Sequence, residues 1–154
     1  MARALCLRKL TARPCTRYEL ADLLAKRGIA KAAAESVLDR FVEVGLIDDA
    51  GLAASYAVAR HEEQGMARAA IATRLRRRGV RADVVRSAVE QIDPASEEAA
   101  ARELVLKRLP GMARLDDATK ARRLVGQLAR KGYPAGLCYR VVREVVAEVE
   151  LPVD

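Results

Sequence analysis

The amino-acid sequence predicts an all-α protein of three tandem three-helix repeats, stacked into an elongated array that can curve. Good helix formers such as Ala, Leu, Arg and Glu are abundant, whereas aromatic residues make up only 3% of the chain. Gly and Pro fall between the apolar stretches rather than inside them. A short pattern built around a glycine occurs three times. We therefore expect helices throughout the chain and no strands.

The repeat is centred on Gly28, Gly79 and Gly132, which lie 51 and 53 residues apart. The segments around these glycines read LAKRGI, LRRRGV and LARKGY. Apolar residues also recur eight positions before and thirteen positions after each glycine. They are Leu20, Ile71 and Leu124 upstream, and Phe41, Ile92 and Val145 downstream. Because both flanks repeat in register, the chain contains a structural repeat rather than a recurring short motif.

Each repeat contains one amphipathic helix that ends at the glycine and a second that follows it. Apolar residues four and eight positions before the glycine share one helix face. The glycine supplies the left-handed conformation that ends a helix, and the Lys/Arg pair before it complements the helix dipole. In the third repeat the second helix carries an apolar residue at every fourth position, at Leu137, Val141, Val145 and Val149.

A period of about 50 residues leaves room for a third helix in each repeat. The candidate segments are residues 2–10, 49–64 and 96–107. Thr16 and Glu19 have the spacing of a capping box, and the acidic segments at residues 48–49 and 93–97 also indicate helix starts. We expect nine helices in three units, residues 1–47, 48–93 and 94–150. One such unit has little core, so neighbouring units must stack.

The composition also restricts where the protein works. The cysteines Cys6, Cys15 and Cys138 are odd in number and widely spaced, which fits a reducing cytoplasm better than a disulfide framework. The apolar run at the N-terminus is too short and too charged for a signal peptide. No stretch approaches the roughly 20 apolar residues of a membrane helix. We expect a cytoplasmic protein that does not associate with a membrane.

The sequence offers no set of residues for catalysis. Its one histidine, His61, stands in a polar stretch, and we interpret it as a solvated side chain. The pairs Asp48–Asp49 and Asp116–Asp117 stand where helix caps belong, and adjacent residues on a helix point apart. No phosphate-binding loop, dinucleotide fingerprint or nucleophile elbow is present. We expect a binding protein rather than an enzyme, with no metal site and no cofactor.

Positive charge is concentrated in the middle of the chain. The net charge is +7, and residues 66–82 alone carry six arginines and no acid. Such a cluster repels itself unless a partner neutralises it, and arginine favours bidentate contacts to phosphate or carboxylate. The other repeats have basic pairs at equivalent positions, which simple complementarity with the helix dipole would also explain. The candidate binding residues are Lys26, Arg27, Arg68, Arg74, Arg76, Arg77, Arg78, Arg81, Arg122, Arg123, Arg130 and Lys131.

Taken in order, these elements resemble the RecX family of recombinase regulators. The resemblance begins with Glu19-Leu20 to Leu24 and Lys26-Arg27-Gly28, and continues with the GLIDD element of residues 45–49. It extends over roughly residues 4–146 with order and spacing kept. The later residues that carry it are Ala53, Tyr56, Gly65, Ile71, Leu75, Arg77-Arg78-Gly79-Val80, Arg123, Leu128 and Arg130-Lys131-Gly132-Tyr133.

The resemblance implies a regulator, mainly an inhibitor, of the RecA recombinase in homologous recombination and the SOS response. Such a protein binds in the groove of the RecA–DNA filament and modulates its ATPase, strand exchange and filament extension. The resemblance also implies phosphate contacts to single- and double-stranded DNA and no active site. We expect a monomer.

Two other functions remain open. One is a helix-turn-helix-like DNA-binding protein that acts without RecA, because residues 17–47 look superficially like that motif. Against it, the same unit occurs three times, and no base-reading helix rich in Asn, Gln and Arg stands out. The other is a helical scaffold whose basic patch meets an acidic protein. Dependence on RecA separates the first interpretation from both.

Overall fold

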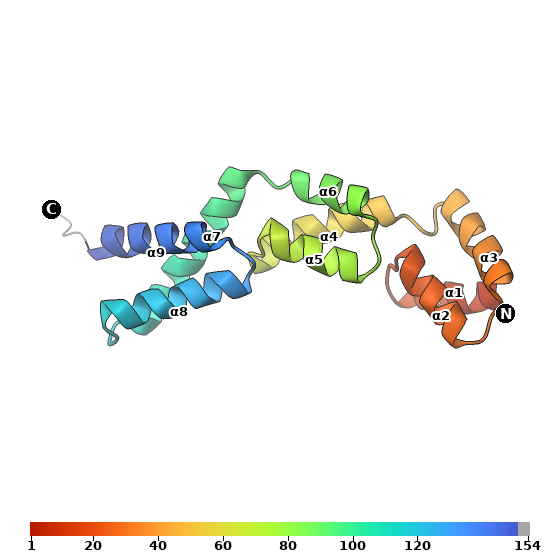
Figure 1. The fold of residues 1–154 in the computed structure, drawn as a ribbon, viewed down its shortest axis with the longest axis horizontal. Helices are drawn as coiled ribbons and strands as arrows, with labels where there is room; N and C mark the ends of the chain where they lie inside the picture. The colour runs from red at the N-terminus through yellow and green to blue at the C-terminus, as the bar shows by residue number, and fades with distance from the viewer. Residues whose placement is uncertain (151–154) are drawn as a thin grey trace. The chain divides into compact units, whose positions relative to one another are not determined.

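The computed structural model describes residues 1–150, and within that range the chain is helical with no strand (Figure 1). The prediction of an all-α fold with nine α-helices is therefore confirmed for the described residues. The elements in order are α1 (Ala2–Ala12), α2 (Arg17–Lys26), α3 (Lys31–Glu43), α4 (Asp49–Gln64), α5 (Arg68–Arg77), α6 (Ala82–Glu90), α7 (Pro94–Arg108), the 3-10 helix η1 (Leu109–Met112), α8 (Asp117–Arg130) and α9 (Ala135–Glu150).

The helices begin at the predicted caps. Thr16 Oγ1 accepts a hydrogen bond from the Glu19 N–H at 3.1 Å, and Glu19 Oε1 accepts one from the Thr16 N–H at 2.9 Å, which completes the capping box. The carboxylates of Asp93 and Asp116 each accept a backbone N–H from the first turn of α7 and α8. These aspartates therefore satisfy the free N–H groups of helix ends.

Each repeat glycine follows its helix in the left-handed conformation that the sequence predicts. The φ angles are +76° at Gly28, +83° at Gly79 and +95° at Gly132. After each glycine the next backbone N–H bonds back to the carbonyl five residues earlier, as from Ile29 to Leu24 at 3.0 Å. The glycine thus closes one helix and directs the chain into the next.

The chain forms two compact units. The first comprises Met1–Tyr56 and Ala72–Gln91, and α1, α2 and α3 pack together within it. The apolar core of these helices is built from Leu20, Leu24, Leu38, Phe41 and Ile47, together with the smaller Ala2, Cys6, Cys15 and Ala34. Both α4 and α5 supply residues to each unit, and the repeat boundaries at residues 47/48 and 93/94 stay a prediction from the sequence.

The second unit comprises Ala57–Ile71 and Ile92–Asp154, and its described part contains α7, η1, α8 and α9. Its core includes Val105, Leu124, Leu128, Val141 and Val145. Ion pairs tie the outside of α7 to α9: Arg102 contacts Glu144 at 2.8 Å and Glu148 at 2.6 Å, and Arg140 contacts Glu98.

Candidate anion-binding site

The predicted arginine cluster lies along α5 and just beyond it: Arg68 begins the helix, and the other five arginines lie on its last turn or follow it. Arg74, Arg76 and Arg77 are exposed, whereas Leu75 between them is fully buried. Arg81 is also exposed and has only a loose contact with Asp83 at 3.5 Å. One side of this helix end therefore packs into the protein, and the other presents guanidinium groups to solvent.

Arg78, one of the candidate binding residues, is only partly exposed and makes contacts inside the protein. Its Nη2 donates to Glu19 Oε1 at 2.9 Å and to the Pro14 carbonyl at 3.3 Å, while its Nε donates to Glu19 Oε2 at 3.2 Å. The guanidinium carbon lies 5.7 Å from the centre of the Tyr56 ring. Arg78 is therefore an internal tie between α2 and the end of α5.

This tie changes the ionisation of Glu19. Burial alone would raise the pKa of the carboxyl group, but hydrogen bonds from Arg78 and the Thr16 N–H, with the charges of Arg78 and Arg13, outweigh it and lower the pKa. The hydrogen bond to Glu19 correspondingly raises the pKa of Arg78, against a smaller effect of burial. Both groups are charged at neutral pH and hold each other in place.

Arg68 is also used inside the protein. Its Nε donates to Glu97 Oε2 at 2.7 Å, and its backbone N–H donates to the same oxygen at 3.1 Å. The Glu97 side chain is only 6% exposed. A carboxylate buried to this degree needs such a partner, so Arg68 is committed to Glu97.

Each of the two arginine ion pairs lies beside a hydrogen bond to a backbone carbonyl, and we call each such contact a joint. Thr16 Oγ1 donates to the carbonyl of Arg78 at 2.6 Å, and the Ala67 N–H donates to the carbonyl of Lys131 at 2.9 Å. Thr16 and Ala67 are 51 residues apart, the same spacing as the first two repeat glycines. In both joints, the residue just before a helix, α2 or α5, donates a hydrogen bond to the carbonyl of the residue just before the glycine of the next repeat, Gly79 or Gly132.

The glycine in each joint lets a neighbouring residue approach closely. A Cβ added at Gly79 would lie 2.2 Å from the Cβ of Tyr18, and one added at Gly132 would lie 2.4 Å from the Cβ of Ala70. By contrast, a Cβ at Gly28 would meet no described atom within 4 Å. Gly79 and Gly132 thus serve both the backbone turn and the packing of the joint, while Gly28 serves the turn alone.

His61 is part of the second joint, and its interpretation as a solvated side chain was wrong. The ring is buried, with Nδ1 3.1 Å from the Met66 carbonyl and Nε2 3.1 Å from Ser96 Oγ. In the same region the Tyr133 hydroxyl donates to the Gly65 carbonyl at 2.8 Å. Burial, and secondarily the charge of Glu97, raises the pKa of Tyr133 to about 12, so this hydroxyl keeps its proton.

The remaining predicted residues lie on α2, on α8 and directly after them. Lys26 is exposed and contacts Asp22 at 2.8 Å, whereas Lys131 is half-buried. The other four residues are exposed and make no ion pair within residues 1–150. They are Arg27, Arg122, Arg123 and Arg130.

Comparison with known proteins identifies the family. Family models of the RecX first and third three-helix domains match residues 2–41 and 96–142. A regulatory protein RecX from Thermobifida fusca is 50% identical over 153 residues, covering 99% of this chain and 83% of the relative. The chain belongs to the RecX family. The resemblance seen in the sequence is thereby confirmed.

Other RecX proteins agree with this assignment. The regulatory protein RecX of Streptomyces lividans is 50% identical over 147 residues, covering 96% of this chain and 78% of the relative. The crystal structure of RecX from Lactobacillus salivarius superposes with a TM-score of 0.81 at 17% identity, covering 97% of this chain and 94% of that one. Another RecX crystal structure gives 0.79 at 21% identity, covering 93% and 70%. At these identities, the structures support the fold alone.

The sequence does not indicate the acidic residues that hold the joints. Its patterns predict Glu19 as part of a capping box and Glu97 as part of a helix start, whereas in the structure they pair with Arg78 and Arg68. The spacing of Thr16 and Ala67 was an available signal for the joints, because it equals the glycine period. No comparable signal pairs Arg68 with Glu97.

None of the helices formed by residues 1–150 combines the length and the apolar character needed to cross a lipid bilayer.

Proposed function

We propose that this RecX-family protein regulates the RecA recombinase, mainly by inhibition. It binds in the groove of the RecA–DNA filament and modulates ATP hydrolysis, strand exchange and filament extension. The observation that supports the proposal most strongly is the 50% identity, over 99% of this chain, to a relative named regulatory protein RecX. The exposed arginines at helix ends supply the charge that such binding needs.

The proposed contacts to RecA and DNA phosphates come from the candidate basic residues other than Arg68 and Arg78. Arg68 and Arg78 instead hold the joints, and they act on binding only by keeping the exposed residues in position. The proposed contact residues are Lys26, Arg27, Arg74, Arg76, Arg77, Arg81, Arg122, Arg123, Arg130 and Lys131.

The protein works by binding, as a monomer, and has no catalytic step of its own. Its relatives are named as regulatory proteins. Cys6, Cys15 and Cys138 are free and buried, which fits the reducing cytoplasm where RecA filaments form.

The test is the single-strand-DNA-dependent ATPase of RecA, measured with increasing amounts of this protein at physiological salt. We expect inhibition at much less than one copy of this protein per RecA subunit, because a regulator bound in the groove acts on the filament and does not have to cover the free DNA. Inhibition only when the protein saturates the DNA would contradict the proposal.

That second result would favour the alternative of a helix-turn-helix-like DNA-binding protein acting without RecA. The exposed Arg74, Arg76 and Arg77 are the feature that keeps this alternative open, because phosphate contacts alone give non-specific DNA binding. Equal affinity for bare DNA and for the RecA filament would support it.

A further inference from the structure

Tyr18, on the first turn of α2, is an exposed aromatic residue beside the end of the arginine cluster. The residue is 58% exposed, and its hydroxyl makes no hydrogen bond with any of residues 1–150. A Cβ added at Gly79 would lie 2.2 Å from both the Cβ and the Cγ of Tyr18, so the base of the ring rests on this glycine. Arg77 and Arg78 immediately precede Gly79. The ring therefore lies next to the turn that follows α5.

The packing of the joint does not require an aromatic side chain at this place. In the second joint, the side chain that lies against the repeat glycine is that of Ala70, whose Cβ would be 2.4 Å from a Cβ at Gly132. A methyl group is thus enough to pack against a joint glycine. Most of the Tyr18 ring extends beyond this contact into solvent, where a ligand can reach it.

The exposed charges next to this turn are positive. Arg74, Arg76 and Arg77 make no ion pair with any of residues 1–150. Most carboxylates shown to contact α2 are already paired: Glu19 with Arg78, Asp22 with Lys26 and Asp39 with Arg17. Asp49 instead accepts the Arg17 N–H at the positive end of the helix dipole. The three free guanidinium groups of α5 outnumber this one carboxylate, so the surface favours an anionic partner.

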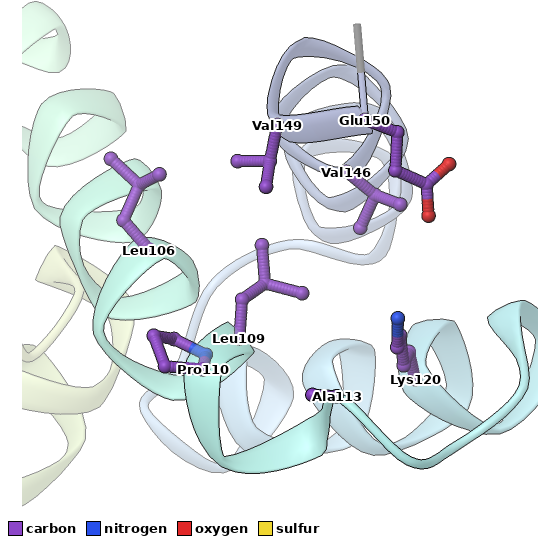
Figure 2. A pocket seen from close by; sticks show the side chains of 8 residues that line it. All are labelled: Leu106, Leu109, Pro110, Ala113, Lys120, Val146, Val149 and Glu150. Atoms are coloured by element: carbon purple, nitrogen blue, oxygen red, sulfur yellow. The ribbon is translucent and has the colours of Figure 1, made fainter. Parts of the chain in front are cut away.

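The surroundings of Tyr18 differ from the continuous apolar surface found elsewhere in the protein. Figure 2 shows such a surface beside α9, where Leu109 points into a hollow that Val146 also lines. On α2, by contrast, the residues one and two turns after Tyr18 are Asp22 and Lys26. A protein partner favours a contiguous apolar patch, whereas a nucleobase needs one open ring face with cations nearby for the phosphates. An isolated ring among charges therefore suits a base of a nucleic acid.

The strandedness of the nucleic acid follows from the geometry of stacking. In a duplex, neighbouring base pairs cover both faces of each base, whereas an unpaired base can turn out and stack on an aromatic side chain. The arginines of α5 can contact the phosphates of either form. The ring thus adds a contact that only a single strand can make.

We propose that Tyr18 stacks on an unpaired base of single-stranded DNA whose neighbouring phosphates are held by the exposed arginines of α5. The proposal deepens the proposed function and rests on it, because it uses the DNA contacts assigned there. It adds a residue that carries no charge to the DNA-binding surface. It also gives the protein a preference for single-stranded over double-stranded DNA.

The first test is Tyr18→Ala, measured by fluorescence anisotropy with a labelled single strand, the corresponding duplex and an abasic strand of equal length. We expect affinity for the single strand to fall about tenfold, equivalent to about 1.4 kcal/mol, with the other two within about twofold. The salt dependence should keep its slope, because stacking releases no counterions. The control is Tyr139→Ala, which removes a tyrosine that is 65% exposed in a groove also lined by Asp117 and Glu150. It should leave all three affinities unchanged.

A second test reports stacking directly and does not depend on a loss of affinity. The chain contains no tryptophan, so Tyr18→Trp introduces a single indole at this place. Stacking on a base quenches indole fluorescence. We expect quenching on addition of the single strand and none with the abasic strand. Tyr139→Trp is the matched control and should not be quenched by either.

Three results would overturn the stacking proposal. Equal losses for the single strand, the duplex and the abasic strand in Tyr18→Ala would mean that the substitution only displaces the arginines. Unchanged affinity for the single strand, or a loss confined to binding of RecA, would mean that the ring does not contact DNA. Absence of quenching in Tyr18→Trp bound to the single strand would exclude stacking. Failure of the unchanged protein to inhibit the RecA ATPase would instead overturn the proposed function alone, because stacking is measured on DNA without RecA.

Discussion

At the scale of single residues, Arg78 and its exposed neighbour Arg77 have the same chemistry but different surroundings. Arg78 makes two hydrogen bonds to Glu19, and both side chains are about one-fifth exposed. We expect Arg78→Ala to lower the free energy of unfolding by about 1.5–3 kcal/mol, because it leaves the Glu19 carboxylate without its charged partner. Arg77→Ala should change it by less than about 0.5 kcal/mol. Urea unfolding of both variants provides the comparison, and equal stabilities would contradict a structural role for Arg78.

The ion pair between Arg78 and Glu19 also makes the stability of the protein depend on pH. The pKa of Glu19 is held below its ordinary value of 4.5, although burial opposes the shift, mainly by hydrogen bonds from Arg78 and the Thr16 N–H. A carboxyl group with a lowered pKa in the folded state stabilises the protein above its unfolded pKa, and this stabilisation is lost as the pH falls through the folded pKa.

We therefore expect the free energy of unfolding to decrease as the pH falls from about 5 to about 3, and to decrease less steeply in Arg78→Ala. Urea unfolding at a series of pH values across this window is the measurement. A decrease of the same size in both proteins would show that other carboxylates cause the acid sensitivity.

The repeat glycines provide a third prediction at this scale. Gly28→Ala introduces only the backbone cost of a left-handed alanine, about 1–2 kcal/mol, because the site is open. Gly79→Ala and Gly132→Ala add a steric clash with Tyr18 or Ala70, which should destabilise by about 1–3 kcal/mol more. Thermal melts of the three variants test the order. A Gly28→Ala variant as unstable as the other two would contradict the packing role of the joint glycines.

At the scale of the element, different residues of α5 are expected to serve stability and binding. Leu75→Ala should destabilise the protein by about 2–5 kcal/mol, because that side chain is fully buried. Alanine at the three exposed positions, Arg74, Arg76 and Arg77, should leave helicity nearly unchanged, because alanine is the best helix former. Circular dichroism and urea unfolding distinguish the two cases. If the triple variant lost its helical signal, the exposed arginines would be structural.

Helix boundaries could be predicted from the sequence because their causes are local. Residues 49–64 form α4 as predicted, and α7 begins at Pro94 because Asp93 caps it, two residues before the predicted start at Ser96. Which arginines pair with carboxylates inside the protein could not be predicted in this way. Arg78 meets a carboxylate 59 residues away, and Arg68 meets one 29 residues away. Such pairs depend on how the repeats pack, which local periodicity does not specify.

The same distinction applies to the candidate site. Charge density shows where arginines gather along the chain, and Arg74, Arg76, Arg77 and Arg81 are exposed, while their role in binding stays a prediction. It could not indicate which charges the protein neutralises internally, because Glu19 and Glu97 lie outside the acid-free stretch of residues 66–82.

At the scale of the whole molecule, the internal ion pairs limit how much of the arginine cluster can bind DNA. Six phosphate contacts to a single strand would give a slope of log affinity against log salt of roughly −4, at about −0.7 per contact. Because Arg68 and Arg78 are held by Glu97 and Glu19, only four arginines of the cluster remain. Their contribution to the slope should therefore be about −3.

Alanine at Arg74, Arg76 and Arg77 should then make the slope for single-stranded DNA less steep by about 2. The measurement is DNA affinity by fluorescence anisotropy across a series of salt concentrations, for the triple variant and the unchanged protein. Arg68→Ala is the matched control, since it removes an arginine of the same cluster that already has an internal partner, and its slope should stay the same. If the slope were unchanged in the triple variant, Arg74, Arg76 and Arg77 would not contact phosphates, and the exposed arginines of α8 would be the next candidates. A smaller slope in Arg68→Ala would instead mean that phosphate displaces Glu97 from the joint when DNA binds.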